Sequence, residues 1–286
     1  MNNAVCVSCV SCLIFSFFAA LRETSSCRME FFAFPAVYDI AFQFRNARKV
    51  VDFIEWCIAT YADIPVRVIV DLACGTGHYT REFARRRYTI YGVDLNPDVC
   101  QYAQLQAQAE WLNLNLFCSD MVDFSLPVRC DLAVSFFDSV TYLPDMHALV
   151  THFQAVSRAI VPGGLYIVEL GVIDHFGNHN AEEVWTEKRR DCTVTTRYIR
   201  DARIHSQNGT FEERCTFHAV CREHAAFFQL KFLKLAIRLE EFERIVSRTG
   251  VFTPLAYYGD FNRKTLLKKN DLPWRVIAVL RNVAKP

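Results

Sequence analysis

The stretch VIVDLACGTGHYT, residues 68–80, decides the fold of this chain. Its first residues form a short, continuous apolar run that ends at Asp71, as expected of a parallel strand covered on both faces. The chain then turns at Gly75-Thr76-Gly77 and continues toward a helix. A strand that passes into a helix through a glycine turn is typical of an α/β sheet in which the turn contacts a ligand.

Strands and helices alternate from this stretch to Gly171. We expect one or two helices between Val37 and Tyr61, ahead of the first strand. Further strands are expected at 89–93, 114–118, 132–137 and 165–170, helices at about 78–87, 97–109 and 146–160, and a turn at 162–164. This alternation indicates a parallel sheet with helices on both faces, whose ligands bind at the carboxyl ends of the strands. Acidic residues stand at or just past those ends: Asp71, Asp94, Asp120, Asp138 and Glu169.

The pattern changes after Gly171. Polar and apolar residues alternate from Val184 to Leu235, and Gln207-Asn208-Gly209 is a type I′ hairpin signal, so we expect an antiparallel insertion over about 175–235. A helix at 240–248, a strand at 252–258 and a last strand at 274–280 complete the chain. The predicted fold class is α/β, with a Rossmann-like, doubly wound sheet and a lid inserted after the fifth strand.

Composition narrows the function. The chain has 286 residues, 52% of them hydrophobic, and 32 basic against 31 acidic residues, so no overall charge attracts it to nucleic acid or to an anionic membrane. The three cations at 85–87 suit the end of a helix better than an RNA contact. Eight of the twelve cysteines are scattered through the expected core without a framework spacing, which favours reduced thiols in the cytoplasm.

The N-terminal segment differs from the rest. Residues 4–21 carry no charge and are followed by Arg22 and Arg28, a pattern that suits a membrane anchor with the main domain on the cytoplasmic side. A cleaved signal peptide is the weaker alternative, and a natural start at Met29 is the simpler one. We therefore expect residues 1–28 to be an apolar leader, either an anchor or no part of the native domain, and 29–286 to form the domain. The Cys6-x-x-Cys9-x-x-Cys12 spacing has Ser16 where a fourth cysteine would be needed, so no metal site is predicted.

The glycine turn departs from the pattern that binds dinucleotides. A G-x-G-x-x-G turn that starts at Gly75 would need a third glycine where Thr80 stands, and a turn that starts at Ala73 lacks its first glycine. The Asp71 carboxylate before the turn is badly placed to face a phosphate and well placed to hold an ammonium group. A ligand with a positive charge is therefore favoured, and a nicotinamide-dependent oxidoreductase is the alternative.

Four segments resemble, in order and at family spacing, the motifs of class I S-adenosylmethionine-dependent methyltransferases of the small-molecule type. They are residues 71–77, 91–97, 118–121 and 162–169. The resemblance covers about residues 35–286 and implies a seven-stranded, mostly parallel sheet with an antiparallel last strand. It also implies S-adenosylmethionine as the cofactor and in-line transfer of its methyl group to oxygen or nitrogen of a small-molecule acceptor. A non-catalytic scaffold that kept the fold is a further alternative.

Site residues follow from the matching positions. Asp71 would bind the methionine ammonium with help from the turn, Asp94 the ribose hydroxyls and Asp120 the adenine amino group, with Leu95 and Met121 on either side of the ring. The segment after strand four would border the donor methyl. The implied cofactor-binding residues are Asp71, Ala73, Gly75, Gly77, Asp94, Leu95, Asp120, Met121 and Phe137.

Candidates for catalysis lie on the acceptor side. Tyr38 could place its ring against the cationic sulfonium, and Asp138 and His175 could act near the acceptor, although a solvated loop histidine is the simpler interpretation of His175. Other acceptor-side candidates are Tyr142, His179, Trp185 and Tyr258. Residues 137–140 read Phe-Asp-Ser-Val, which counts against enzymes that methylate nucleobases or glutamine. We expect the lid to roof a small acceptor, and the sequence leaves the oligomeric state open.

Overall fold

The computed structural model describes residues 35–175, 180–205, 209–222, 224–269 and 271–284. The apolar leader, Met29 and His179 lie outside the described residues, so the predictions made for them stay predictions. The helices are α2 (Pro35–Ala41), α3 (Ala47–Tyr61), α4 (His78–Arg85), α5 (Pro97–Ala109), the 3-10 helix η3 (Ser139–Tyr142), α6 (Met146–Ala159) and α7 (Leu239–Thr249). Within the described ranges, none of these helices combines the length and apolar character needed to cross a membrane.

The main sheet has seven strands in the order β10-β11-β5-β4-β1-β2-β3. Its strands are β1 (Val68–Leu72), β2 (Thr89–Asp94), β3 (Asn115–Cys118), β4 (Cys130–Ser135), β5 (Ile160–Gly171), β10 (Phe252–Tyr258) and β11 (Arg275–Asn282). Neighbouring strands from β3 to β5 run parallel, whereas β11 is antiparallel to both β5 and β10. The predicted doubly wound sheet with an antiparallel last strand is therefore confirmed.

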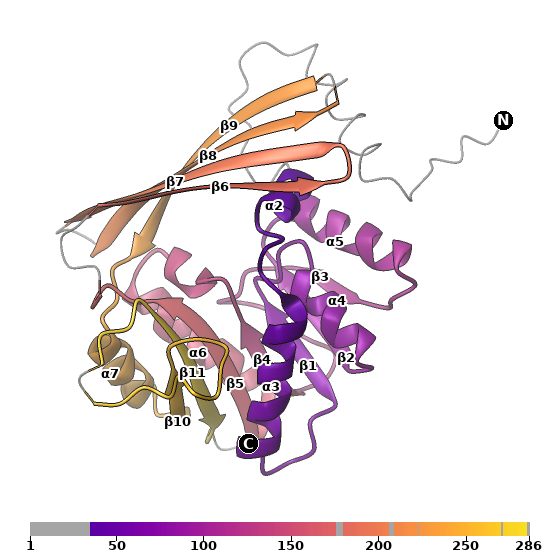
Figure 1. Ribbon diagram of the computed structural model, residues 1–286. Helices are drawn as coiled ribbons and strands as arrows, with labels where there is room; N and C mark the ends of the chain where they lie inside the picture. Colours follow the sequence, from indigo (N-terminus) through magenta and orange to yellow (C-terminus); the bar gives the residue numbers. More distant parts are fainter. Residues whose placement is uncertain (1–34, 176–179, 206–208, 223, 270, 285–286) are drawn as a thin grey trace.

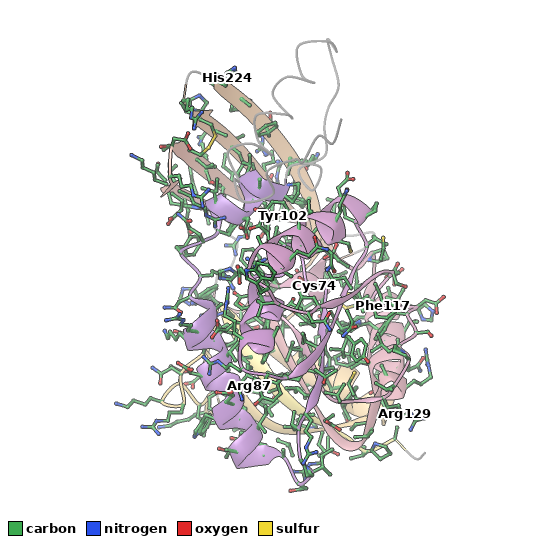
Figure 2. The ribbon with its side chains drawn as sticks, turned by 90° about the vertical axis from the view of Figure 1, so that its right-hand side faces the viewer. Cys74, Arg87, Tyr102, Phe117, Arg129 and His224 are labelled. Carbon is green, nitrogen blue, oxygen red and sulfur yellow. A yellow bond between two sulfur atoms is a disulfide. The ribbon has the colours of Figure 1, made fainter. Side chains whose placement is uncertain are left out.

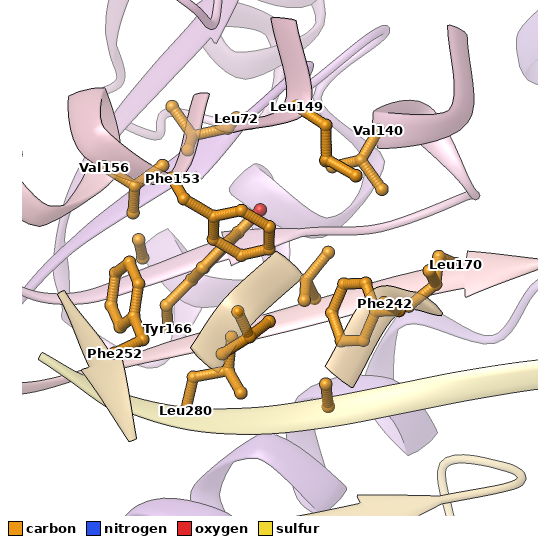
Figure 3. Close-up of a cluster of buried hydrophobic side chains, with 14 of the residues drawn as sticks. Leu72, Val140, Leu149, Phe153, Val156, Tyr166, Leu170, Phe242, Phe252 and Leu280 are labelled. Atoms are coloured by element: carbon orange, nitrogen blue, oxygen red, sulfur yellow. The ribbon is translucent and has the colours of Figure 1, made fainter. Parts of the chain in front are cut away.

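Helices cover both faces of this sheet because successive strand residues point to opposite sides. Ile69 joins a buried cluster with residues of α3 and α4, and its neighbour Val70 joins another with residues of α6 and α7. Figure 3 shows the second cluster, in which Phe153 of α6 packs on Tyr166 of β5 and on Phe242 of α7. This packing fixes the sheet and leaves the loops at its carboxyl edge to form a site.

Local signals place most element ends where they were predicted. Asn96 caps α5 through its side chain ahead of Pro97, and Gly250 ends α7 in a left-handed conformation. Two predictions were wrong. The expected turn at 162–164 lies inside β5, where the pairing with β4 changes register, and β4 ends two residues early because Phe137 and Asp138 have φ angles of 64° and 61°.

The insertion forms a second, antiparallel sheet, as predicted. Its strands are β6 (Ala181–Arg189), β7 (Cys192–His205), β8 (Thr210–Cys221) and β9 (His224–Leu235), paired in chain order. This sheet lies across the carboxyl edge of the main sheet, and α2 packs beneath β6 and β7 (Figure 1). Of the predicted hairpin turn, Gln207 and Asn208 lie outside the described residues.

One cysteine pair corrects the prediction of reduced thiols. Cys192 and Cys221 stand directly opposite each other on β7 and β8, with Cα atoms 4.1 Å apart, and form a disulfide. The pair is 29 residues apart in the chain, so only the strand register brings it together. In the described part of the chain, the cysteines that remain free are Cys57, Cys74, Cys100, Cys118, Cys130 and Cys215.

Candidate functional site

The turn after β1 opens the site. Ala73, Gly75 and Gly77 all have positive φ angles, of 54°, 55° and 74°, so the backbone curls before α4 begins. A Cβ added to Gly75 would meet no described atom within 4 Å, whereas one at Gly77 would lie 3.2 Å from Ala103 of α5. The turn therefore has open space above Gly75, where a ligand can approach the backbone, and close helix packing at Gly77.

Asp71 lies under this turn. Its side chain is buried, with 1% of the residue exposed, and its carboxylate accepts a hydrogen bond of 2.6 Å from the Thr80 hydroxyl of α4. Burial raises the pKa of Asp71 to about 7, although the Thr80 hydrogen bond opposes the rise. The carboxyl group therefore changes its charge near neutral pH, and its role toward an ammonium group stays a prediction.

Asp94 ends β2 beside the turn. Its two carboxylate oxygens accept hydrogen bonds from the backbone N–H groups of Gly75 and Asn96, at 2.8 and 3.0 Å, which fix their direction. Burial raises the pKa of this carboxyl group. The next residue, Leu95, is 69% exposed, so an apolar side chain stands at the carboxyl edge beside an oriented carboxylate. These features suit a ribose that carries a flat aromatic base.

Asp120 and Met121 follow β3, the next strand of the sheet. Asp120 is exposed and accepts a hydrogen bond from the Val122 backbone N–H at 3.0 Å. Met121 is partly buried, and its carbonyl accepts a hydrogen bond of 2.9 Å from the ring of His152 on α6. The structure thus brings the predicted adenine-contact residues to the same sheet edge as Asp94 and Leu95.

A buried carboxylate holds the segment after β4. It belongs to Glu169, to which the sequence analysis assigned no function. Glu169 of β5 accepts a hydrogen bond of 2.7 Å from the Phe137 backbone N–H and pairs with Arg45 at 2.9 Å and Arg275 at 3.2 Å. Burial alone would raise the pKa of Glu169, but the two guanidinium groups hold it below its usual value. Arg45 also lies over the Phe137 ring, 4.0 Å from its centroid. These contacts fix Phe137 at the edge of the site.

Tyr38 of α2 lies beside this segment. Its ring centroid is 5.9 Å from that of Phe137 and 4.6 Å from that of Phe42, and Phe42 packs against Trp185 of the second sheet at 5.5 Å. Burial raises the pKa of the Tyr38 hydroxyl well above its usual value. Two of the acceptor-side candidates, Tyr38 and Trp185, therefore belong to one aromatic wall between the turn region and the second sheet.

Asp138 contacts the second sheet. One carboxylate oxygen accepts a hydrogen bond of 2.6 Å from the Gly171 backbone N–H, and the other pairs with the Lys234 ammonium of β9. Lys234 also lies 3.3 Å from Glu213 of β8 and 4.8 Å from the centroid of the Tyr142 ring. The sequence analysis missed Lys234 and Glu213, although a lysine at an inward position of an alternating strand was a signal for them.

The remaining candidates lie elsewhere. His175 is exposed on the segment after β5. Tyr258 is buried at the end of β10, where its hydroxyl pairs with that of Tyr61 and its ring packs on Phe53, so it serves the core. In the part of the chain that the structure describes, no cluster of histidine, cysteine or acidic side chains could hold a metal ion.

Two of the three arginines at 85–87 form ion pairs. Arg85 pairs with Glu82, and Arg86 pairs with Glu55 and Asp52. Figure 2 shows Arg87 toward the end of the molecule opposite the second sheet, where His224 is labelled, while Cys74 of the turn lies between them. Arg87 therefore lies away from the turn, while Arg85 and Arg86 are charges at the end of α4 that acidic side chains balance.

A buried aspartate of α2 links the turn to the second sheet. Asp39 accepts hydrogen bonds from the Thr76 hydroxyl of the turn at 2.8 Å and from Tyr102 of α5 at 3.3 Å. Its carboxylate and its backbone carbonyl both accept from the Arg189 guanidinium of β6, at 2.5 and 2.7 Å. Burial alone would raise the pKa of Asp39, and Arg189 and Arg81 hold it below its usual value.

Comparisons with known proteins agree with this geometry. Residues 69–164 match the family model described as a methyltransferase domain. Over 101 residues the chain is 30% identical to the dTDP-3-amino-3,4,6-trideoxy-α-D-glucopyranose N,N-dimethyltransferase of Streptomyces venezuelae, a match that covers 35% of this chain and 41% of that enzyme. The chain spans about half, or less, of the length of the curated relatives that it matches.

Two solved structures extend the likeness over most of the chain. An S-adenosylmethionine-dependent methyltransferase from Clostridium acetobutylicum superposes with a TM-score of 0.71 at 20% identity, covering 88% of this chain and 98% of that one. The amino pentose methyltransferase CalS10 from Micromonospora echinaspora, solved with S-adenosylmethionine bound, gives 0.66 at 18% identity, covering 91% and 100%. Residues 69–164 therefore match a methyltransferase domain, and the chain has the fold of these S-adenosylmethionine-dependent methyltransferases, as its motifs predict.

Proposed function

We propose that this protein is an S-adenosylmethionine-dependent methyltransferase that acts on a small molecule held beneath the second sheet. One observation carries the proposal: the glycine turn, Asp94, Leu95 and the Asp120–Met121 pair meet at one edge of the sheet, under a separate antiparallel roof. This arrangement offers separate places for a nucleoside, for an amino-acid moiety and for an acceptor.

The residues present fit the donor. The open space above Gly75 lets the methionine portion approach the backbone, and the Asp94 carboxylate is already oriented toward a diol by two backbone hydrogen bonds. Leu95 and Met121 supply apolar contacts for adenine, and Asp120 supplies an acceptor for its amino group. Asp71 and Ala73 complete the set, with Asp71 as the partner of the ammonium group.

Catalysis here depends chiefly on alignment. When bound, S-adenosylmethionine supplies a methyl group on a sulfonium, and the acceptor's lone pair forms the new bond as the carbon–sulfur electron pair stays on sulfur. The rings of Phe137 and Tyr38 line the space where that methyl would lie, and the second sheet restricts the access of water to it. Asp138 stands beside this wall, and His175 is kept as a third candidate for handling the proton of the acceptor.

The acceptor that we favour is a sugar amine. The relative from Streptomyces venezuelae is named for N,N-dimethylation of a dTDP-amino sugar, and CalS10 is named as an amino pentose methyltransferase. The acceptor side of this chain is lined by tyrosines and paired charges, a surface that suits a polyhydroxylated ligand. Transfer to nitrogen is therefore the first choice, and transfer to oxygen the second.

Calorimetric titration with S-adenosylmethionine tests the proposal. We expect binding by the intact protein, at least tenfold weaker binding by Asp94→Asn, and a change within about twofold for Asp98→Asn, which alters an exposed carboxylate in the first turn of α5. No binding by the intact protein would overturn the proposal. Thermal stabilisation by NAD and not by S-adenosylmethionine would favour an oxidoreductase, and binding of the donor without turnover of a broad acceptor panel would favour a scaffold.

We also propose a cytoplasmic location. Six of the cysteines in the described ranges are free thiols, which supports a reducing compartment, whereas the Cys192–Cys221 disulfide is the feature that speaks against it. Fractionation of cells that express the full chain or a chain starting at Met29 tests the location and the role of the leader together. Recovery of both chains from the soluble cytoplasmic fraction is the expected result, and recovery of the Met29 chain outside that fraction would contradict it.

A further inference from the structure

A buried lysine stands behind the acceptor side of the site. Lys234 projects from the inner face of β9 with only 7% of its side chain exposed, and it contacts Asp138 of the segment after β4 and Glu213 of β8. Burial alone would lower the pKa of the Lys234 ammonium, but Asp138 in particular holds it well above its usual range. A fully charged lysine is thus placed between two carboxylates inside the protein.

The two carboxylates occupy different layers. Glu213 is buried, accepts a hydrogen bond from the Tyr198 hydroxyl and stands opposite Arg200 in the strand register. Asp138 keeps 23% of its side chain exposed, and the neighbouring Tyr142 is 39% exposed. The accessible surface is therefore formed by Asp138 and Tyr142, while Lys234 and Glu213 support them from behind.

The direction of the Asp138 carboxylate is defined by two contacts. The Gly171 N–H holds one oxygen at 2.6 Å, and the Lys234 ammonium holds the other. Asp138 directly follows Phe137, and β4 is the immediate neighbour of β1 in the sheet, so this carboxylate lies at the same carboxyl edge as the glycine turn. A fixed, partly exposed carboxylate at that place can accept a hydrogen bond from the acceptor.

We propose that Lys234, supported by Glu213, is a positioning residue that aims the Asp138 carboxylate at the acceptor, so that the acceptor must be an amine or an alcohol with a hydrogen to donate. This inference rests on the proposed methyltransferase function. The acceptor's N–H or O–H donates to Asp138 while its lone pair attacks the methyl group, and the proton of the product then passes to water. An acceptor that carries a carboxylate at this point would meet Asp138 as a like charge.

The probes are three dTDP sugars: the 3-amino-3,4,6-trideoxy sugar for which the Streptomyces venezuelae relative is named, dTDP-glucose, and dTDP-glucuronic acid. Product mass and release of S-adenosylhomocysteine measure turnover, and calorimetry in the presence of S-adenosylhomocysteine measures probe binding. We expect the full chain to bind and methylate the amine or the alcohol probe and to leave the carboxylate of the third probe unmethylated. Preferred transfer to that carboxylate would overturn the inference.

Variants separate positioning from folding. Lys234→Met is expected to lower kcat/KM at least tenfold, chiefly through kcat, with probe binding weakened and with donor affinity changed by less than twofold. Lys234→Arg should recover part of the loss, and Glu213→Gln, which keeps the Lys234–Asp138 pair, should lose less. The matched control is Lys231→Met on the outer side of β9, where the lysine is 64% exposed and pairs with Glu212 at 2.5 Å. It should leave all of these quantities unchanged.

The outcomes distinguish this inference from the proposed function. Absence of donor binding by the intact protein would overturn the function itself. Donor binding without binding or turnover of the amine and alcohol probes would overturn the inference alone. A Lys234→Met variant that keeps kcat/KM within twofold would also overturn it, as would one whose donor affinity and melting temperature fall in step with turnover, because that pattern marks a purely structural lysine. If Lys234→Met does not fold, the other variants decide. The inference would be overturned if Glu213→Gln left kcat/KM unchanged and Lys234→Arg lowered kcat/KM at least as much as Asp138→Asn does.

Discussion

Affinity for S-adenosylmethionine should depend on pH through Asp71. The carboxyl group is buried under the glycine turn, and burial raises its pKa from an ordinary value of 3.8 to about 7. On the proposal that Asp71 holds the donor's ammonium group, the ligand binds the ionised carboxylate, so below pH 7 the carboxyl group must lose a proton for each ligand that binds. The association constant should then fall about tenfold for each pH unit below 7, about a hundredfold by pH 5. Above pH 8 it should fall again, since an α-amino group loses its own proton there.

Calorimetry over pH 5–8.5 measures this dependence, and repeats in two buffers of different ionisation enthalpy count the protons released. Asp71→Asn should bind weakly and with little dependence on pH from 5 to 7. Thr80→Val removes the hydrogen bond of 2.6 Å that favours the ionised carboxylate, so it should move the midpoint to higher pH. Asp98→Asn is the control, because it changes an exposed carboxylate of α5 and should leave both the affinity and its slope in place. A wild-type affinity that is flat from pH 5 to 7, or an equal slope in Asp71→Asn, would refute the reasoning.

The same pKa has a consequence for folding stability. A carboxyl group whose pKa is raised in the folded state contributes stability below pH 4, and this contribution is lost as the pH rises through 7. A rise from 3.8 to about 7 corresponds to about 4 kcal/mol. Between pH 4 and 8, Asp71→Asn should therefore gain up to that amount relative to the wild type, measured as the difference in the free energy of unfolding in urea.

Three further predictions concern stability. His152 is buried, and burial lowers its pKa to about 4. Its contribution to the free energy of unfolding is therefore complete above pH 6.5 and should fall by about 3 kcal/mol toward pH 4. Urea unfolding of His152→Gln should lack this decline. Glu169→Gln should cost about 3 kcal/mol or more in chemical denaturation because it breaks a buried ion-pair network, whereas the exposed Glu182→Gln should leave the free energy of unfolding nearly unchanged. Replacing Cys192 and Cys221 by serine should cost about 3 kcal/mol, seen as a lower melting temperature that a reducing agent reproduces in the wild type; an unchanged temperature would contradict a stabilising disulfide.

Features that depend on neighbouring residues were predictable from the sequence. The β-branched run before Asp71, the Asn96 cap and the glycine at the end of α7 each act within a few residues, so the elements that they define lie where expected. The parallel direction of the first strands followed from the alternation of strands and helices, because crossovers between parallel strands have one handedness. The donor side of the site consists of residues that follow β1, β2 and β3. These residues meet at one edge because the carboxyl ends of parallel strands lie together.

Features that depend on register between distant segments were not predictable. Cys192 and Cys221 are paired by the alignment of β7 with β8, and Lys234 meets Asp138 only because β9 crosses over the main sheet. Arg45 reaches Glu169 across 124 residues of chain. For Lys234 and Arg45 the residue type alone fits a surface position better, and only the fold decides that they are buried and paired. For the two cysteines the sequence leaves the pairing open, and only the strand register decides it.

The second sheet, which covers the acceptor side, shares buried contacts with the glycine turn on the donor side. Asp39 of α2 binds Thr76 of the glycine turn and Arg189 of the second sheet with the same carboxylate, so the turn and the roof share one buried anchor. A shift of the backbone at Thr76 would change the hydrogen bond from Thr76 to Asp39. Because Asp39 also binds Arg189, it would change the contact of α2 with β6 as well. Lys234 belongs to this same second sheet and positions the Asp138 carboxylate. The position of the second sheet therefore affects the geometry of the contact between Asp138 and the acceptor. Asp39 and Arg189 therefore connect the glycine turn to the second sheet through buried side-chain contacts of α2.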